Sequence, residues 1–200
     1  MKELFLLFFI AFSFHGFAQK IKLVEGSDSA LKGQHSINLE FTYDGITIGK
    51  QMLNEKEYID KKKGEYNAKE PGKGDTWEMK WYADRKDRFE PRFVGSFSSA
   101  GMSVKQDAEF TIIFNTTTIE PGYNIGGLAL GWTPTHRNAY IDGVAVLVAT
   151  SDKSKVIARW TIDNAPGNGV ADWDTGFRIQ ESYATAGQRL GRLIAKDLGK

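Results

Sequence analysis

Apolar residues recur along this 200-residue chain with a period of two in some segments and with helical spacing in others. Ile37, Leu39 and Phe41 alternate with polar residues, which is the pattern of a half-buried strand. The continuous apolar run of residues 144–149 indicates a strand that is buried on both faces. Strands are expected at residues 37–41, 46–48, 108–115 with an extension over 116–119, 140–150 and 156–163. The last two are separated by a polar turn and predict an antiparallel hairpin.

Helical spacing of apolar residues predicts two to three helices. The first begins at Asn54, where Glu57 completes a capping-box pattern, and runs for about 12 residues. A second pattern of this kind, Asp75 with Glu78, begins another helix. A third helix is expected at residues 179–198, where apolar residues return every three or four positions up to the end.

Residues 75–93 read DTWEMKWYADRKDRFEPRF and place several aromatic rings among charged side chains. Trp77 and Trp81 are four residues apart, so on a helix they lie on one stripe. Burial of each ring would contribute roughly 1.5–3 kcal/mol, which favours a helix anchored to a core by its aromatic residues. An exposed surface that stacks on a sugar ring is the alternative interpretation of the same stripe.

These elements predict one α+β domain over residues 37–200. We expect a mixed, mainly antiparallel sheet of about five strands, with two to three helices packed on one face. The C-terminal helix carries the small residues Ala184, Ala186, Gly187 and Gly191, which are expected to let it lie close against the sheet.

The first residues have the composition of an export signal. A short basic start at Met1-Lys2, an apolar run over 4–14 and small residues before Gln19 predict a signal peptide of residues 1–18, cleaved after Ala18. The apolar run is about 11 residues long, too short to cross a bilayer of about 30 Å as a helix. The sequence therefore predicts a periplasmic or secreted protein without stable membrane insertion, which begins with a flexible leader over residues 19–36.

Composition excludes several functions. The chain has no cysteine, which rules out disulfides, thiolate catalysis and cysteine-ligated zinc. Its 26 basic and 25 acidic residues give a net charge of +1 and alternate in sign, so no patch suited to nucleic acid is expected. His35 and His136 are far apart in sequence, and no zinc-binding or serine-hydrolase motif is present. We expect no catalytic residues and no cofactor.

The long loop before the C-terminal helix holds the best candidates for ligand contact. Trp132 and Trp173 could line a groove together with the neighbouring carboxylates Asp172 and Asp174. Asp163, Asn164, Asp172 and Asp174 also offer oxygen ligands for calcium, but their spacing matches no regular calcium loop, and we expect no metal site. A catalytic pair formed by carboxylates from distant strands leaves no local signature, so a hydrolase stays open as a further alternative.

Residues 140–198 place a long strand, a turn, a strand that carries Ala158-Arg159, a loop and the small-residue helix ESYATAGQRLGRLIAKDL in that order. The order resembles that of uncharacterised bacterial envelope domains related in fold to the periplasmic part of the curli-secretion channel protein and to the amino-terminal domain of the Tol translocation protein. The resemblance implies a mixed sheet with helices on one face and a role in envelope assembly or protein interaction, with no catalytic residues to carry over. The helices expected between residues 54 and 97 are not part of that pattern.

The sequence therefore predicts an exported, non-enzymatic envelope domain that meets another envelope protein. The alternative is a carbohydrate or small-ligand binding protein that uses its loop tryptophans. The oligomeric state does not follow from the sequence.

Overall fold

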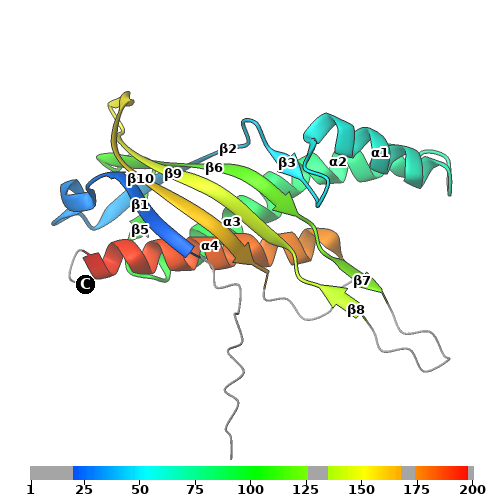
Figure 1. Cartoon of the computed structure of the whole chain (residues 1–200). Coiled ribbons are helices and arrows are strands. Elements are labelled where there is room, and N and C mark those ends of the chain that lie inside the picture. Colours follow the sequence, from blue (N-terminus) through cyan, green and yellow to red (C-terminus); the bar gives the residue numbers. More distant parts are fainter. Residues whose placement is uncertain (1–19, 126–134, 168–173, 198–200) are drawn as a thin grey trace, which may run out of the picture.

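The computed structural model describes residues 20–125, 135–167 and 174–197, and these form a mixed α+β fold (Figure 1). Its main sheet has eight strands, so the expectation of about five strands was too low. A separate two-stranded ribbon consists of β7 (Tyr123–Ile125) and β8 (Thr135–Arg137). The strands of the main sheet are β1 (Lys20–Gly26), β2 (Ser36–Thr42), β3 (Thr47–Ile48), β4 (Leu53–Asn54), β5 (Ser103–Val104), β6 (Phe110–Glu120), β9 (Tyr140–Ala149) and β10 (Asp152–Pro166).

The main sheet is antiparallel at one side and parallel at the other. Its strand order is β1-β10-β9-β6-β2-β5, and the pairs are antiparallel from β1 to β6 and parallel from β6 to β5. The short β3 lies parallel to the end of β6 and antiparallel to β4. The predicted hairpin is confirmed as β9 and β10, although β10 extends beyond the expected residues 156–163 at both ends, with Tyr140 opposite Pro166.

The expectation of a flexible leader at residues 19–36 was wrong. Residues Lys20–Gly26 form β1, which pairs along β10 at the edge of the sheet. A 3₁₀ turn at Asp28–Leu31 follows, and its Leu31 is completely buried. An edge strand has only one hydrogen-bonded neighbour, so it tolerates the charged residues that made this segment look irregular in sequence.

Three α-helices lie between β4 and β5 in the chain, and a fourth follows β10. They are α1 (Glu55–Asn67), α2 (Lys73–Asp84), α3 (Glu90–Ser98) and α4 (Thr175–Asp197), with a π-helical turn at Arg85–Phe89 between α2 and α3. The capping box at the start of α1 is confirmed, because Asn54 and Glu57 exchange side-chain and backbone hydrogen bonds. The second expected box was wrong: α2 begins two residues earlier, and Asp75 lies in its first turn. None of the helices in the described ranges is both long and apolar enough to span a membrane.

The core lies between one face of the sheet and the helices α3 and α4 (Figure 1). Phe41, Phe114 and Trp160 belong to one row across β2, β6 and β10, and Phe93 of α3 packs on that row, 4.7 Å from Phe114 between ring centroids. Tyr183 of α4 is fully buried and stacks on Phe89 with ring centroids 5.1 Å apart. These rings pack together with buried aliphatic residues such as Leu190 and Ile194 and hold the two layers together.

The small residues of α4 were expected to pack against the sheet, but Gly187 and Gly191 pack against α3. A Cβ added at Gly187 would lie 2.4 Å from the carbonyl oxygen of Phe93, and one added at Gly191 would lie 2.9 Å from that of Phe97. Both carbonyls belong to α3, so the two glycines permit close packing of α4 on α3. The larger apolar residues of α4, such as Leu190, are buried in the core.

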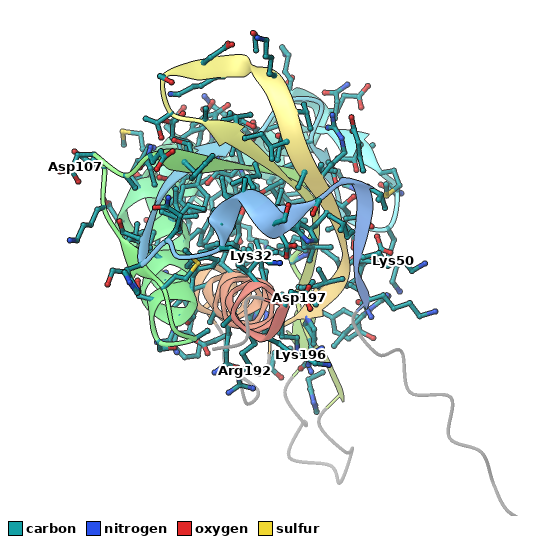
Figure 2. All side chains as sticks on the ribbon, turned by 90° about the vertical axis from the view of Figure 1, so that its left-hand side faces the viewer. Lys32, Lys50, Asp107, Arg192, Lys196 and Asp197 are labelled. Carbon is teal, nitrogen blue, oxygen red and sulfur yellow. The ribbon has the colours of Figure 1, made fainter. Side chains whose placement is uncertain are left out.

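The opposite face of the sheet carries no helix of the described ranges (Figure 1). At its centre Ile113, Val144 and Val146 are half-buried by one another and by their neighbours. A view along α4 shows this helix below the sheet, with Arg192, Lys196 and Asp197 near its exposed C-terminal end (Figure 2). That end therefore carries charges of both signs.

Candidate functional site

The helical hairpin α1–α2 and the first turn of α4 enclose a cleft that is lined by aromatic rings. Three cavities in this region share Tyr66 of α1 and Trp77 of α2 as lining residues, and we call them together the aromatic cleft. The cavity beside α4 has a volume of about 230 Å³, the cavity beside Glu120 about 220 Å³, and the cavity at the α1–α2 turn about 670 Å³. The first two are named below the α4 chamber and the Glu120 chamber.

The spacing of aromatic residues on α1 and α2 brings four rings close together at the cleft. Trp77 stacks on Trp81, one helical turn further along α2, with ring centroids 5.6 Å apart. The Tyr66 ring lies 5.7 Å from the Trp77 ring between centroids. Tyr58 lies 5.3 Å from Trp81 and 6.0 Å from Trp77 between ring centroids. Trp77 is therefore at the centre of a cluster of four rings.

The two tryptophans differ in exposure. Trp81 is only 6% exposed and its indole nitrogen donates a 2.8 Å hydrogen bond to Glu55, so the prediction of a core anchor is confirmed for this residue. Trp77 packs against the core but is only partly buried, and it lines all three cavities. One helix stripe thus supplies both a core residue and a ring that faces the cleft.

Polar contacts fix the hairpin that carries these rings. The ammonium group of Lys63 on α1 lies 2.7 Å from the Asp75 carboxylate and 2.8 Å from the Glu78 carboxylate on α2. The backbone amide of Gly74 donates a 2.7 Å hydrogen bond to the Asn67 side chain. A Cβ at position 74 would lie 2.3 Å from the carbonyl oxygen of Lys63, so glycine is required where the helices approach.

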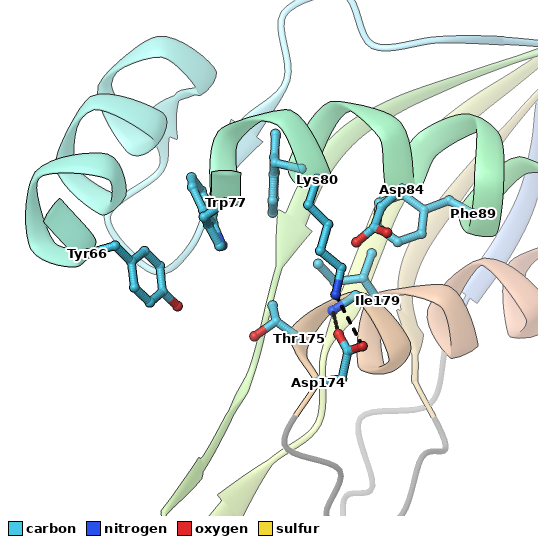
Figure 3. A pocket seen from close by; sticks show the side chains of 10 residues that line it. Tyr66, Trp77, Lys80, Asp84, Phe89, Asp174, Thr175 and Ile179 are labelled. Carbon is cyan, nitrogen blue, oxygen red and sulfur yellow. Dashed lines mark hydrogen bonds and ion pairs between the residues drawn. The ribbon is translucent and has the colours of Figure 1, made fainter. Parts of the chain in front are cut away.

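The α4 chamber combines the aromatic wall with charged groups of both signs (Figure 3). Lys80 of α2 reaches across the chamber to Asp174, with a nitrogen–oxygen distance of 3.5 Å. Asp174 also accepts hydrogen bonds from Arg88 at 3.0 Å and from the backbone amide of Gly176 at 2.8 Å. It therefore links the hairpin to the first turn of α4. Its partly exposed neighbours Thr175 and Tyr66 complete the rim.

The two carboxylates of the α4 chamber have opposite pKa shifts. Burial raises the pKa of Asp84 above its ordinary value, and the nearby charges of Arg88 and Lys80 offset only part of this effect. Burial acts in the same direction on Asp174, but its hydrogen bond to Arg88 and the charge of Arg88 outweigh burial and lower its pKa. Asp174 is therefore the more strongly ionised of the two carboxylates at neutral pH.

The Glu120 chamber lies on the other side of Tyr66 and Trp77. Glu120 ends β6, is only 6% exposed, and its Oε1 accepts a 3.2 Å hydrogen bond from the backbone amide of Gly122. Its other carboxylate oxygen, Oε2, is buried without a hydrogen-bond partner among the described residues. Burial raises the pKa of Tyr58 in the same chamber, with smaller contributions from Tyr66 and Glu120, so its phenol is protonated at neutral pH.

The structure describes only part of the site that the sequence predicted. Trp132, Asp172 and Trp173 lie outside the described residues. Asp174 is described and lines the α4 chamber, where it is held by Arg88 and Lys80. The loop tryptophans therefore stay predictions, while Asp174 has a place at the cleft.

The other polar residues singled out in the sequence lie elsewhere. Asp163 and Asn164 line a separate cavity of about 510 Å³ together with Asp142, away from Asp174. No group of three or more metal-ligating side chains suited to a metal ion occurs within residues 20–125, 135–167 and 174–197. His136 is exposed on β8.

Sequence reasoning missed Tyr66, Trp77 and Glu120 as lining residues of a cleft. Trp77 was expected to anchor its helix to the core, but the structure buries it only partly. Tyr66, near the end of α1, is likewise only partly buried. Glu120 follows a strand of β-branched residues and precedes Pro121-Gly122, a position usually taken for a turn. No local signal in the sequence marked its burial, because residues beside turns usually lie at the surface.

Comparison with known proteins assigns no family to this chain. No protein-family model matches it, and no curated protein matches it. Among solved structures, the PelC dodecamer from Paraburkholderia phytofirmans is similar over 88% of this chain and 97% of that chain, with 10% sequence identity and a TM-score of 0.39. A point mutant of PelC in a second space group gives a TM-score of 0.38 at the same identity and coverage. These TM-scores are too low to support a statement about the fold or function of this chain.

Proposed function

We propose that this protein is an exported, non-enzymatic binding domain of the bacterial envelope and that the aromatic cleft holds a carbohydrate. One observation carries the proposal: Trp77 is only partly buried and lines every cavity of the cleft, beside Tyr66 and a small set of polar groups. Export and the envelope location rest on the predicted signal peptide of residues 1–18 and on the resemblance of residues 140–198 to envelope domains.

The chemistry of the cleft suits a sugar ring. The C–H faces of a pyranose pack on aromatic rings, and its hydroxyl groups exchange hydrogen bonds with carboxylate, ammonium and hydroxyl groups. Binding sites for small ligands typically combine apolar walls with a few placed polar groups in this way. Trp77 and Tyr66 would supply the wall, and Lys80, Asp174 and Thr175 the polar groups at its edge.

Binding is favoured over hydrolysis because the carboxylates of the α4 chamber are held by basic groups. Asp174 contacts both Arg88 and Lys80, and Asp84 lies 3.6 Å from Arg88. A glycosidase acid needs a proton to deliver and its partner needs a free face toward the sugar. Paired in this way, the two groups are better suited to fixing the first turn of α4 than to proton transfer.

Calorimetric titration tests the proposal. The full exported chain would be titrated with neutral hexasaccharides that differ in linkage or in the substituent at C2, such as cellohexaose, hexa-N-acetylchitohexaose and maltohexaose. We expect saturable binding of at least one of them, weakened about tenfold or more by Trp77→Ala, which corresponds to about 1.4 kcal/mol. Tyr82→Ala is the matched control, because Tyr82 is an exposed aromatic residue of the same helix that lines none of the three cavities.

Two other results would change the assignment. Loss of binding in Trp173→Ala with normal binding in Trp77→Ala would move the site to the loop tryptophan predicted from sequence. Absence of binding by the unmodified protein to every saccharide of the panel would contradict the proposal.

Interaction with another envelope protein is a second candidate function, favoured by the helix-free face of the sheet. Ile113, Val144 and Val146 form an apolar centre on that face, between ion pairs such as Lys153–Glu40 at 2.6 Å. An apolar centre with a polar rim is the usual composition of a protein interface. Crosslinking in envelope extracts should capture a partner that Val146→Lys no longer captures, whereas capture of the same partner by this variant would refute the assignment.

A further inference from the structure

The basic side chains at the edge of the aromatic cleft indicate what kind of saccharide it accepts. Lys80 lines both the α4 chamber and the cavity at the α1–α2 turn, and Lys73 lines the second of these. Both lysines lie on the face of α2 that carries Trp77, which is four residues after Lys73 and three before Lys80. At a rise of about 1.5 Å per residue, the two lysines stand about 10 Å apart along the helix, with Trp77 between them. A sugar ring packed on Trp77 would therefore have a cation near each end.

The ammonium group of Lys80 is accessible from the cleft. Its side chain is 57% exposed, and it makes no hydrogen bond in the part of the chain that the structure describes. Its one ion pair there joins it to Asp174, with a nitrogen–oxygen distance of 3.5 Å (Figure 3). Exposed ion pairs contribute little to stability, because water solvates both charges well. A ligand carboxylate can therefore compete with Asp174 for the three N–H donors of Lys80.

Asp174 keeps other partners when Lys80 turns toward a ligand. Its carboxylate accepts hydrogen bonds from Arg88 at 3.0 Å and from the backbone amides of Gly176 at 2.8 Å and Phe177 at 3.4 Å. Two of these donors belong to the first turn of α4, and all three offset the negative charge of Asp174. Asp174 therefore repels an incoming anion only weakly, and its place at the start of α4 does not depend on Lys80.

The balance of charge around the cavity at the α1–α2 turn is positive. Among the described residues that line this cavity, Lys73 and Lys80 are basic and Glu70 is the one acid. Glu70 pairs with Lys73 at 3.1 Å, and both side chains are more than half exposed. Lys69 adds an ammonium group 5.9 Å from the centre of the Tyr66 ring. The local field beside the aromatic wall therefore favours an anion over a cation.

We infer that the saccharide bound in the aromatic cleft is acidic: a uronic-acid ring lies against Trp77, and its carboxylate binds the ammonium group of Lys80. Lys80 is thus a specificity-determining residue, and Lys73 is placed to meet the carboxylate of a neighbouring acidic sugar. The inference rests on the proposed carbohydrate site and names the chemical class of its ligand. A neutral saccharide of the same linkage would still pack on the aromatic wall but would lack this charge-assisted hydrogen bond.

Two matched pairs of ligands test the charge of the saccharide. Cellohexaose would be compared with the glucuronate hexamer of the same linkage, and hexagalacturonate with its fully methyl-esterified form. Calorimetric titration of residues 19–200 should show binding of the acid about tenfold or more tighter than that of its neutral counterpart in at least one pair. The preference should shrink when the salt concentration rises from about 0.1 M to about 1 M, because the screening length falls from about 10 Å to about 3 Å.

A pair of lysine variants locates the charge that is responsible. Lys80→Gln should weaken binding of the acid about tenfold or more beyond its effect on the neutral counterpart. Lys56→Gln is the matched control, because Lys56 is an exposed lysine of α1 that pairs with Asp60 and lines none of the three cavities. It changes the net charge by the same amount and should leave the preference for the acid intact. Both variants should unfold at nearly the same urea concentration as the unmodified chain, because both ion pairs are exposed.

Each outcome bears on a different statement. Equal or weaker affinity for the acid than for its neutral counterpart in both pairs would overturn this inference and leave the carbohydrate site standing. An equal loss of affinity for the acid in Lys80→Gln and Lys56→Gln would also overturn it, because binding would then depend only on net charge. Absence of binding by the unmodified chain to every saccharide, neutral or acidic, would refute the proposed function together with this inference.

Discussion

Replacing Gly187 with alanine adds one methyl group to α4 at the point where the backbone of α3 is closest. The added Cβ would lie 2.4 Å from the carbonyl oxygen of Phe93, whereas contacts of 3.0–3.4 Å are already tight for a Cβ. Because the neighbouring atom is part of the backbone, no rotamer change relieves the clash, and the helices must separate by roughly 0.6–1 Å. The position lies in the packed layer between Phe93 and Tyr183, so the separation also loosens the rings around it.

The size of the effect follows from two opposing contributions. Alanine is favoured over glycine within a helix by about 1 kcal/mol, while overpacking a core costs about 1–3 kcal/mol. A clash with backbone belongs at the upper end of that range, so we expect Gly187→Ala to lower the free energy of unfolding by about 2 kcal/mol. Gly64→Ala is the matched control: Gly64 lies within α1, and a Cβ there would meet no atom within 4 Å apart from its chain neighbours and the backbone of its own helix. It should stabilise the protein by about 0.5–1 kcal/mol.

Urea denaturation followed by far-ultraviolet circular dichroism measures both variants. The expected result is a midpoint shift to lower urea for Gly187→Ala and to higher urea for Gly64→Ala, with similar m-values. If both variants shifted the midpoint upward, helix propensity alone would govern the two sites. The close packing of α4 on α3 would then be refuted.

Two further predictions concern polar groups around the cleft and the core. Tyr183→Phe removes the 2.8 Å hydrogen bond to the buried Thr116 hydroxyl and should cost about 1–3 kcal/mol of unfolding free energy, much of which the double variant with Thr116→Val should recover. Asp174→Ala removes the acceptor for the first amides of α4 and should cost about 1 kcal/mol at pH 7. Because the pKa of Asp174 is lowered by folding, its contribution is full above its ordinary pKa of about 4 and is lost as pH falls through the folded value. Unfolding curves at pH 7 and pH 3 should therefore show a smaller difference between Asp174→Ala and the unmodified chain in acid, and an equal or larger difference would contradict the role of its charge.

Local signals were sufficient to predict the elements that have strong caps or long apolar runs. The capping box at Asn54 fixed the start of α1, and the apolar run of β9 identified the central hairpin. Strand β1 could not be predicted in the same way, because its sequence KIKLVEG gains its pairing from β10, which lies far away along the chain. The two-residue strand β3 lies within the strand expected at residues 46–48, whereas β4 and β5 were not expected from the sequence and pair with β3 and β2.

The candidate site was harder to predict than the fold. Whether Trp77 lies in the core or at a surface depends on how far α1 and α2 stand from α4, and this distance depends on contacts between residues far apart in sequence, such as Lys80 with Asp174 at the start of α4. The sequence spacing places Trp77 and Trp81 on one helix stripe. It does not show that Trp81 is buried in the core while Trp77 faces the cleft. Glu120 could not be recognised as a lining residue from the sequence, because only the structure shows that it is buried.

Nuclear magnetic resonance locates the ligand most directly. In ¹H–¹⁵N spectra of residues 19–200, the indole N–H signal of each tryptophan is assigned from single Trp→Phe variants, and the strongest saccharide ligand is then titrated. The account predicts progressive shifts of the Trp77 indole and of the Gly122 amide, with the Trp160 indole in the core unchanged. Shifts confined to the indoles of Trp132 and Trp173, or to amides of the helix-free sheet face, would contradict a carbohydrate site at the aromatic cleft.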